Sequence, residues 1–226
     1  MPTFSAFFDE SGTQRSSSTV VVGGYVGSAN QWEAFRREWQ ALLNQERIRV
    51  LHRSHLETFR GEFQRKNGWN DERRKCVLQC AHEIIKQRTD VGIAAAVIRG
   101  DFERVMPPAL KRAFGGPYGW AAHDCVVGIG HWAATHQRPQ LVQYVFEAGA
   151  RGRKQVEKMF ESLYSDPKFR ELCRNWKLDF RTESRLPRTS ASRLLCLRNL
   201  QTHGQSDRVG CHDSTAPISQ GPRATQ

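Results

Sequence analysis

The order of strand-like and helix-like segments constrains the fold of this chain more than any other feature. Two runs rich in β-branched and aromatic residues, at 3–8 and 19–26, flank the turn signal Ser11-Gly12 and predict a hairpin. A helix and then alternating strands and helices follow. A hairpin with such units behind it predicts an α/β domain, in which helices pack on the faces of a mixed sheet.

Helix caps and apolar spacing indicate where the later elements begin. Ser28 and Asn70 are suitable N-cap residues for two long helices. The continuous apolar run at 91–98 predicts a buried strand, and Pro107-Pro108 interrupts any helix between 101 and 114. The expected helices lie at 29–46, 70–88, 118–135, 153–164 and 167–175, and the other expected strands lie at 141–146 and 176–182.

The C-terminal segment 188–226 has a different composition from the rest of the chain. It contains no aromatic residue, although the whole chain has 12 Phe, 6 Trp and 4 Tyr. A segment of this kind cannot bury enough apolar surface to offset the entropy of ordering it. We therefore expect one domain at 1–187 and a disordered tail at 188–226, with at most a short helix at 192–200.

The charge of the chain favours anionic partners. Its net charge is +11 and its isoelectric point is near 9.8, which favours nucleic acid above other partners because neutralised phosphates release counterions. The N-terminus lacks the pattern of a signal peptide, and no apolar run approaches the roughly 20 residues of a membrane span. The expectation is a cytoplasmic protein with no membrane association.

The cysteines do not follow a metal-binding or disulfide pattern. The six cysteines form no Cys-x-x-Cys pair, and only Cys76 and Cys80 lie one helical turn apart. A zinc site needs about four ligands, and no second pair completes one. Buried free thiols are the expected state of these residues.

Acidic residues stand at the ends of two predicted strands. Asp9 and Glu10 follow the first strand, and Glu147 follows the strand at 141–146. If these strands are parallel neighbours, their carboxylates converge at one edge of the sheet, where α/β proteins usually bind ligands. Clustered carboxylates favour Mg²⁺ or Mn²⁺, which can activate water for phosphodiester cleavage. The alternative is that these acids only cap turns and loops.

A second cluster involves histidine. His52 and His55 are three residues apart and, with Glu57, could form a metal or acid–base site. The alternative is that they are ordinary surface residues.

Four segments together carry a family resemblance. They are Phe7-Phe8-Asp9-Glu10-Ser11-Gly12, Val22-Gly23-Gly24-Tyr25-Val26, the helix with Trp32, Phe35 and Trp39, and Leu51-His52. Over about Thr3 to Leu186 the chain resembles a bacterial and phage family, the domain-of-unknown-function family numbered 3800. This resemblance implies a ribonuclease H-like fold and a metal-dependent nuclease site.

The resemblance also implies roles for individual residues. Asp9 would be the principal metal ligand, Glu10 the second acid of the signature, and Glu147 a later strand-end carboxylate. His52 matches a recurrent histidine of the family to which no role is assigned.

The chain departs from the family after Pro187. The family continues with Leu-Gln, then Ala-Asp and an apolar helix, and that Asp would complete the acidic site; here the chain reads Arg188-Thr189-Ser190-Ala191. Read from the second base of each codon, 193–198 permits Asp-Phe-Phe-Ala-Tyr-Glu, so we hypothesise that the tail is a frameshift product. Such a copy would lack one metal ligand and be weak or inactive, and its coding DNA tests the hypothesis.

The sequence therefore leads to one principal interpretation and one alternative. The first is a ribonuclease H-like nuclease using Mg²⁺ or Mn²⁺, with the three acids as the catalytic group and Asp9 and Glu147 as metal ligands. Arg151, Arg153 and Lys154, close to Glu147 in sequence, would contact the substrate backbone. The alternative is a non-catalytic module that binds nucleic acid or protein on the same fold.

Overall fold

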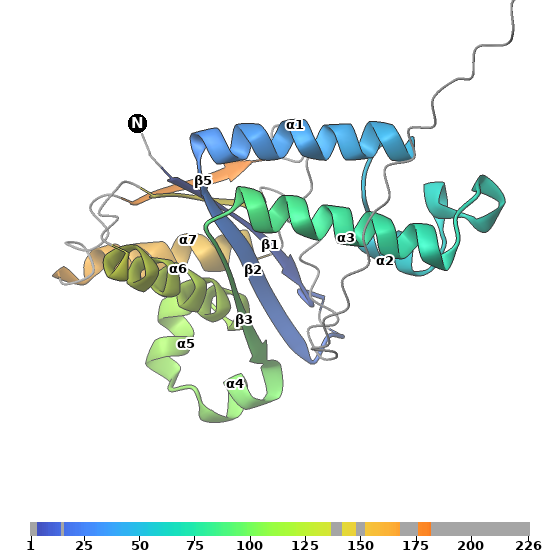
Figure 1. Cartoon of the computed structure of the whole chain (residues 1–226). Helices are drawn as coiled ribbons and strands as arrows, with labels where there is room; N and C mark the ends of the chain where they lie inside the picture. The colour runs from blue at the N-terminus through green and yellow to red at the C-terminus, as the bar shows by residue number, and fades with distance from the viewer. Residues whose placement is uncertain (1–3, 15, 137–141, 148–151, 168–175, 182–226) are drawn as a thin grey trace, which may run out of the picture.

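A five-stranded mixed sheet forms the centre of the molecule. The computed structural model describes residues 4–14, 16–136, 142–147, 152–167 and 176–181 (Figure 1). Its strands are β1 (Phe4–Ser11), β2 (Thr19–Ser28), β3 (Val91–Ile98), β4 (Val142–Glu147) and β5 (Trp176–Arg181), in the order β3-β2-β1-β4-β5. β2 is antiparallel to β1 and β3, whereas β1, β4 and β5 are parallel. The predicted α/β class is confirmed, and this sheet is consistent with a ribonuclease H-like fold.

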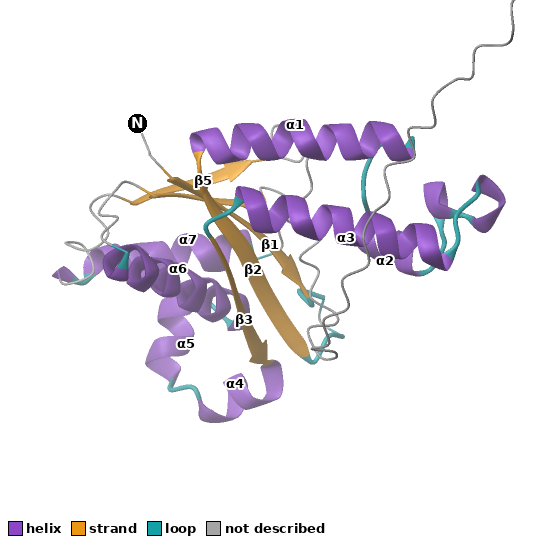
Figure 2. Cartoon of the chain, in the orientation of Figure 1, coloured by secondary structure: helices purple, strands orange, loops and turns teal. Residues whose placement is uncertain are grey.

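Helices cover both faces of this sheet. The helices are α1 (Ala29–Glu46), α2 (Arg53–Glu57), η1 (Gly61–Phe63), η2 (Arg65–Asn67), α3 (Asp71–Arg88), α4 (Arg99–Val105), α5 (Pro108–Phe114), α6 (Pro117–Thr135) and α7 (Arg153–Ser165). Figure 2 shows α1 and α3 on one side of the sheet and α6 and α7 on the other. The short helices α2, η1 and η2 connect α1 to α3.

The predicted caps explain where the long helices start. The Ser28 hydroxyl accepts a hydrogen bond from the Gln31 amide at 3.3 Å, and the Gln31 side chain accepts one from the Ser28 amide at 2.7 Å. This reciprocal capping box fixes the first residue of α1. Asn70 accepts from the Arg73 amide at 2.8 Å and caps α3 through this single hydrogen bond. Pro107-Pro108 separates α4 from α5, so the predicted interruption of the helix at these prolines is confirmed.

The buried side chains form two clusters. One lies between the sheet and α6 and α7, and includes Phe8, Tyr144, Phe146 and Phe160. The other lies among α1, the short helices and α3, with Trp39 at its centre. The second cluster holds α1, α3 and the short helices together as a helical layer on one side of the sheet.

The prediction that β3 is a buried strand is wrong. β3 is the last strand at one edge of the sheet, and alternate residues along it are exposed. Ile98, for example, is 54% exposed. The run is apolar throughout because the residues on its exposed face are mostly the small residues Gly92, Ala94 and Ala96, which can be exposed at little cost.

Two glycines in the hairpin occupy positions where a side chain would be strained or would clash. Gly12 turns the chain from β1 towards β2 with φ at +71°, a left-handed conformation that favours glycine. At Gly24 a Cβ atom would lie 2.5 Å from the Phe7 carbonyl oxygen and 2.6 Å from the Phe8 ring. Together these glycines allow β1 and β2 to pair closely around Asp9 and Glu10.

The cysteine prediction is confirmed for one residue and wrong for another. Cys125 is buried and free, and its thiol donates to the Val22 carbonyl at 3.4 Å. Cys76 is also free but exposed. The buried stripe of α3 consists of Val77, Ala81 and Ile85, so Cys76 falls just outside it.

Cys125 should make stability decrease at alkaline pH. Burial raises the pKa of its thiol from the ordinary 9.0 to about 12. Between these values the unfolded chain releases the thiol proton and the folded chain keeps it, so the free energy of unfolding falls by about 1.4 kcal/mol per pH unit. Urea unfolding of wild type and Cys125→Ser at pH 8 and pH 10.5 checks this. A stability difference between the two that does not change with pH would contradict the buried thiol.

Some predicted segments fall outside the part of the chain that is described. These are most of the helix expected at 167–175, the tail at 188–226, and Arg151. None of the helices within the described ranges has the length and apolarity needed to cross a membrane.

Candidate acidic site at the sheet edge

Two of the predicted acidic residues occupy equivalent positions on neighbouring strands. β1 and β4 pair in parallel from Phe4 with Val142 to Phe7 with Val145. The paired register ends there, and the same offset carried two residues further along each strand would place Asp9 opposite Glu147. The expectation that these strands are parallel neighbours is therefore confirmed at the level of the backbone. The side chain of Glu147 lies outside the described set.

Contacts on either side of the sheet show which face each residue of β1 occupies. Phe7 meets Trp32 of α1 edge to face, with ring centroids 4.8 Å apart. Phe8 stacks on Phe146 on the opposite face, at 4.7 Å. Since successive side chains of a strand alternate between faces, Asp9 lies on the α1 face and Glu10 on the α6 face.

A hydrogen bond confirms the position of Glu10. The buried Tyr118 hydroxyl, at the start of α6, donates to the Glu10 carboxylate at 3.2 Å. The sequence places Glu10 beside Asp9, but strand alternation directs the two carboxylates to different faces. The structure thus brings Asp9 and Glu147 to one edge and holds Glu10 through Tyr118. The sequence analysis missed Tyr118, because only the tertiary fold brings α6 to β1.

Removing the Tyr118 hydroxyl should destabilise the protein measurably. Tyr118→Phe keeps the buried ring but removes the hydroxyl that donates a hydrogen bond to Glu10. We expect the free energy of unfolding to fall by about 1 kcal/mol. Urea denaturation of the two proteins measures the difference. Unchanged stability would mean that solvent replaces the hydroxyl at no cost, and that Tyr118 does not hold Glu10 in place.

The Asp9 carboxylate is the described oxygen ligand at this edge. One oxygen of Asp9 accepts a hydrogen bond from the Glu10 amide at 2.9 Å, and the side chain is partly exposed. Mg²⁺ is commonly held by one or two carboxylates together with waters and substrate phosphates. Among the described residues, no group of three or more His, Cys, Asp or Glu side chains gathers as a metal site. Of the two acids at 9 and 147, only the Asp9 side chain is described, and it offers one carboxylate at this edge.

The predicted substrate-binding residues open the helix that follows β4. Arg153 and Lys154 are exposed in the first turn of α7. Arg153 donates to Glu157 at 2.8 Å and lies 4.6 Å over the Phe180 ring. Lys154 makes no hydrogen bond or ion pair with any described residue, so its charge is available to an anion near the edge.

The histidine cluster lies in a different part of the fold. His52 precedes α2, and its ring centroid is 5.2 Å from that of His55. Glu57 forms an ion pair with Arg53 at 2.8 Å. The carboxylate that the histidine hypothesis needs is therefore already engaged by an arginine.

Comparison with known proteins adds no family assignment. No protein-family model matches this chain, and no match to a curated protein was found. The resemblance to the family numbered 3800 stays a prediction from the sequence.

Proposed function

We propose that this protein is a divalent-metal-dependent nuclease with a ribonuclease H-like domain. The observation that supports this most is the equivalent position of Asp9 and Glu147 on adjacent parallel strands. Both stand where the strands reach their carboxyl ends, the edge at which open α/β sheets bind ligands. The net charge of +11 supports nucleic acid as the substrate, and the proposed place of action is the cytoplasm.

The residues at the edge would have different roles in the reaction. Asp9 and Glu147 would hold the Mg²⁺ or Mn²⁺ ion, which supplies Lewis acidity and activates water when bound. Glu10, held by Tyr118, would orient the end of β1. Lys154 and Arg153 would attract the phosphate backbone to the edge.

The direct test is cleavage of single- and double-stranded DNA and RNA with Mn²⁺ or Mg²⁺. We expect cleavage of at least one substrate with the metal and none after chelation. Cleavage that persists after chelation would contradict the proposal, as would the absence of cleavage under every condition.

A non-catalytic nucleic-acid-binding module is the second candidate. The observation that favours it is the small number of metal ligands. Within the described residues, no group of three or more Asp, Glu, His or Cys side chains could hold a metal ion. Binding of nucleic acid that is equally strong with and without metal, and without any cleavage, would select this candidate.

A further inference from the structure

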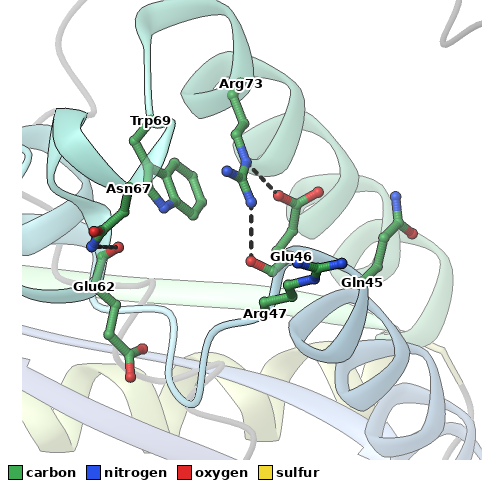
Figure 3. A pocket seen from close by; sticks show the side chains of 7 residues that line it. All are labelled: Gln45, Glu46, Arg47, Glu62, Asn67, Trp69 and Arg73. Atoms are coloured by element: carbon green, nitrogen blue, oxygen red, sulfur yellow. Dashed lines mark hydrogen bonds and ion pairs between the residues drawn. The ribbon is translucent and has the colours of Figure 1, made fainter.

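A polar cavity lies away from the acidic edge, where the short helices join α1 to α3. Its volume is about 590 Å³, within the range of small-molecule sites. Figure 3 shows the side chains around it, among them Arg47, Trp69 and Arg73. The proposed nuclease chemistry does not use any of these residues.

Trp69 presents a hydrogen-bond donor beside the cavity. Its side chain is 3% exposed, and it packs edge to face on Phe63 at 4.9 Å. The Arg73 guanidinium lies 4.2 Å over the indole ring. The indole N–H has no acceptor among the described residues, and in Figure 3 the nitrogen lies on the cavity side of the ring. This N–H is not one of the fully buried unpaired polar atoms, so it can donate to an acceptor oxygen of a molecule in the cavity.

The carboxylates around the cavity are already neutralised. Glu46 accepts from Arg73 at 2.9 Å, and Glu62 accepts from the Arg49 side chain at 2.7 Å and its amide at 3.0 Å. Burial raises the pKa of Glu62, but the hydrogen bonds and charge of Arg49 outweigh it and hold that pKa below its ordinary value. Both acids are therefore paired with arginines, so neither is left to attract a cation.

The carbonyl groups at the end of α1 are also satisfied. The Leu43 carbonyl accepts from the Ile48 amide at 3.0 Å, and the Asn44 carbonyl accepts from the Arg47 amide at 3.1 Å. The Glu46 carbonyl accepts from Arg73 at 3.0 Å. These three carbonyl oxygens, at positions 43, 44 and 46, are therefore engaged within the protein.

Arg47 supplies the excess positive charge. Its exposed side chain makes no hydrogen bond or ion pair within the described part of the chain. Three arginines, at 47, 49 and 73, stand against the two glutamates, so the group carries a net charge of +1. Arg47 also ends α1 in the left-handed conformation, with φ at +55° and ψ at +40°, where glycine is favoured. Folding alone therefore does not explain an arginine at this position.

We propose that this cavity binds the phosphate group of a nucleotide. Arg47 would pair with the phosphate charge, and the Trp69 N–H would donate to a phosphate oxygen. Asn67, whose side-chain amide donates one hydrogen bond to the Glu62 carbonyl at 3.3 Å, has a second N–H to offer. The volume exceeds that of a lone phosphate ion, so the phosphate belongs to a larger molecule. That molecule is either a free nucleotide or a nucleic-acid strand, and only the strand would link this site to the proposed nuclease.

The test measures binding by the full chain in the presence of a chelator, so that it does not depend on the acidic edge. Adenosine monophosphate is titrated by calorimetry, and a fluorescently labelled single-stranded oligonucleotide is titrated by anisotropy at low ionic strength. Arg47→Gly removes the guanidinium and relieves the left-handed conformation, whereas Trp69→Phe removes the N–H together with part of the buried indole ring, so the melting temperature of this variant is measured beside its binding. Arg37→Ala, at an exposed arginine of α1 without a partner in the described chain, is the charge-matched control.

We expect both cavity variants to weaken binding about tenfold, because each removes a hydrogen bond to a charged group, and the control to bind like the wild type. Arg47→Gly should melt at the same temperature as the wild type or higher, which separates lost binding from lost structure. Weakened binding of the mononucleotide identifies a free nucleotide as the ligand, and an effect on the oligonucleotide alone identifies a strand. The proposal is overturned if the wild type binds neither probe, or if all three variants bind alike.

Discussion

Replacing Asp9 with asparagine is expected to reduce metal-dependent cleavage at least about a hundredfold. Even groups that only orient a metal ligand typically contribute about 10- to 100-fold to affinity or activity, so a ligand itself should contribute at least as much. Asparagine keeps the size of the side chain and an oxygen that can accept from the Glu10 amide. The fold should therefore survive. Initial cleavage rates at several Mn²⁺ concentrations measure the loss.

Two further variants show whether the loss belongs to the proposed edge. Asp101→Asn removes an exposed carboxylate of α4 that pairs, among the described residues, with Arg104 one helical turn away, and it should cleave like the wild type. Glu10→Gln changes the acid on the other face of the sheet. If Glu10→Gln abolished cleavage while Asp9→Asn did not, the metal site would lie on the α6 face, and our assignment would be wrong.

Replacing Phe8 with alanine is expected to lower the free energy of unfolding by about 3–5 kcal/mol, the usual cost of truncating a buried phenylalanine. Phe8 is 2% exposed and stacks on Phe146 with the rings 11° from parallel. A second ring, that of Tyr144, lies 6.2 Å away. These contacts join β1 to β4, the strands that carry Asp9 and Glu147, so the variant should also lose activity. Urea denaturation gives the stability change.

The neighbouring residue provides the matched control. Phe7 lies on the opposite face and is only partly buried, so Phe7→Ala should cost clearly less than Phe8→Ala. Because a loss of this size is a large part of the stability of a typical domain, Phe8→Ala could fail to fold. Phe8→Leu then tests the same contact with a smaller cavity. Equal costs at positions 7 and 8 would contradict the stacked packing between β1 and β4.

Local signals were enough to predict the long helices. The range 29–46 was predicted as a helix and is α1, because Ser28 and Gln31 form a capping box using residues only three apart. The start of α3 and the gap between α4 and α5 follow from Asn70 and Pro107-Pro108 in the same way. Interactions within one turn of a helix do not depend on the rest of the fold, so the sequence shows them directly.

The tertiary structure corrected or added what depends on distant neighbours. The bounds of β3 were right, but its place at the edge of the sheet, and so its exposure, depends on which strands pair. The cavity around Trp69 was not predicted, since it forms only when the short helices fold back between α1 and α3. A left-handed arginine at position 47 leaves no distinctive pattern in the sequence.

Local sequence signals specify the five strands, the long helices α1, α3, α6 and α7, and the acids at the carboxyl ends of two strands, but not the short helices between these elements. The specified features depend on propensity, capping and apolar period, all of which act over a few residues. The pairing of β1 with β4 and the contact of Glu10 with Tyr118 are set by the tertiary structure. Strand partners and sheet faces are selected by the packing of segments more than 100 residues apart, and no local pattern contains that information.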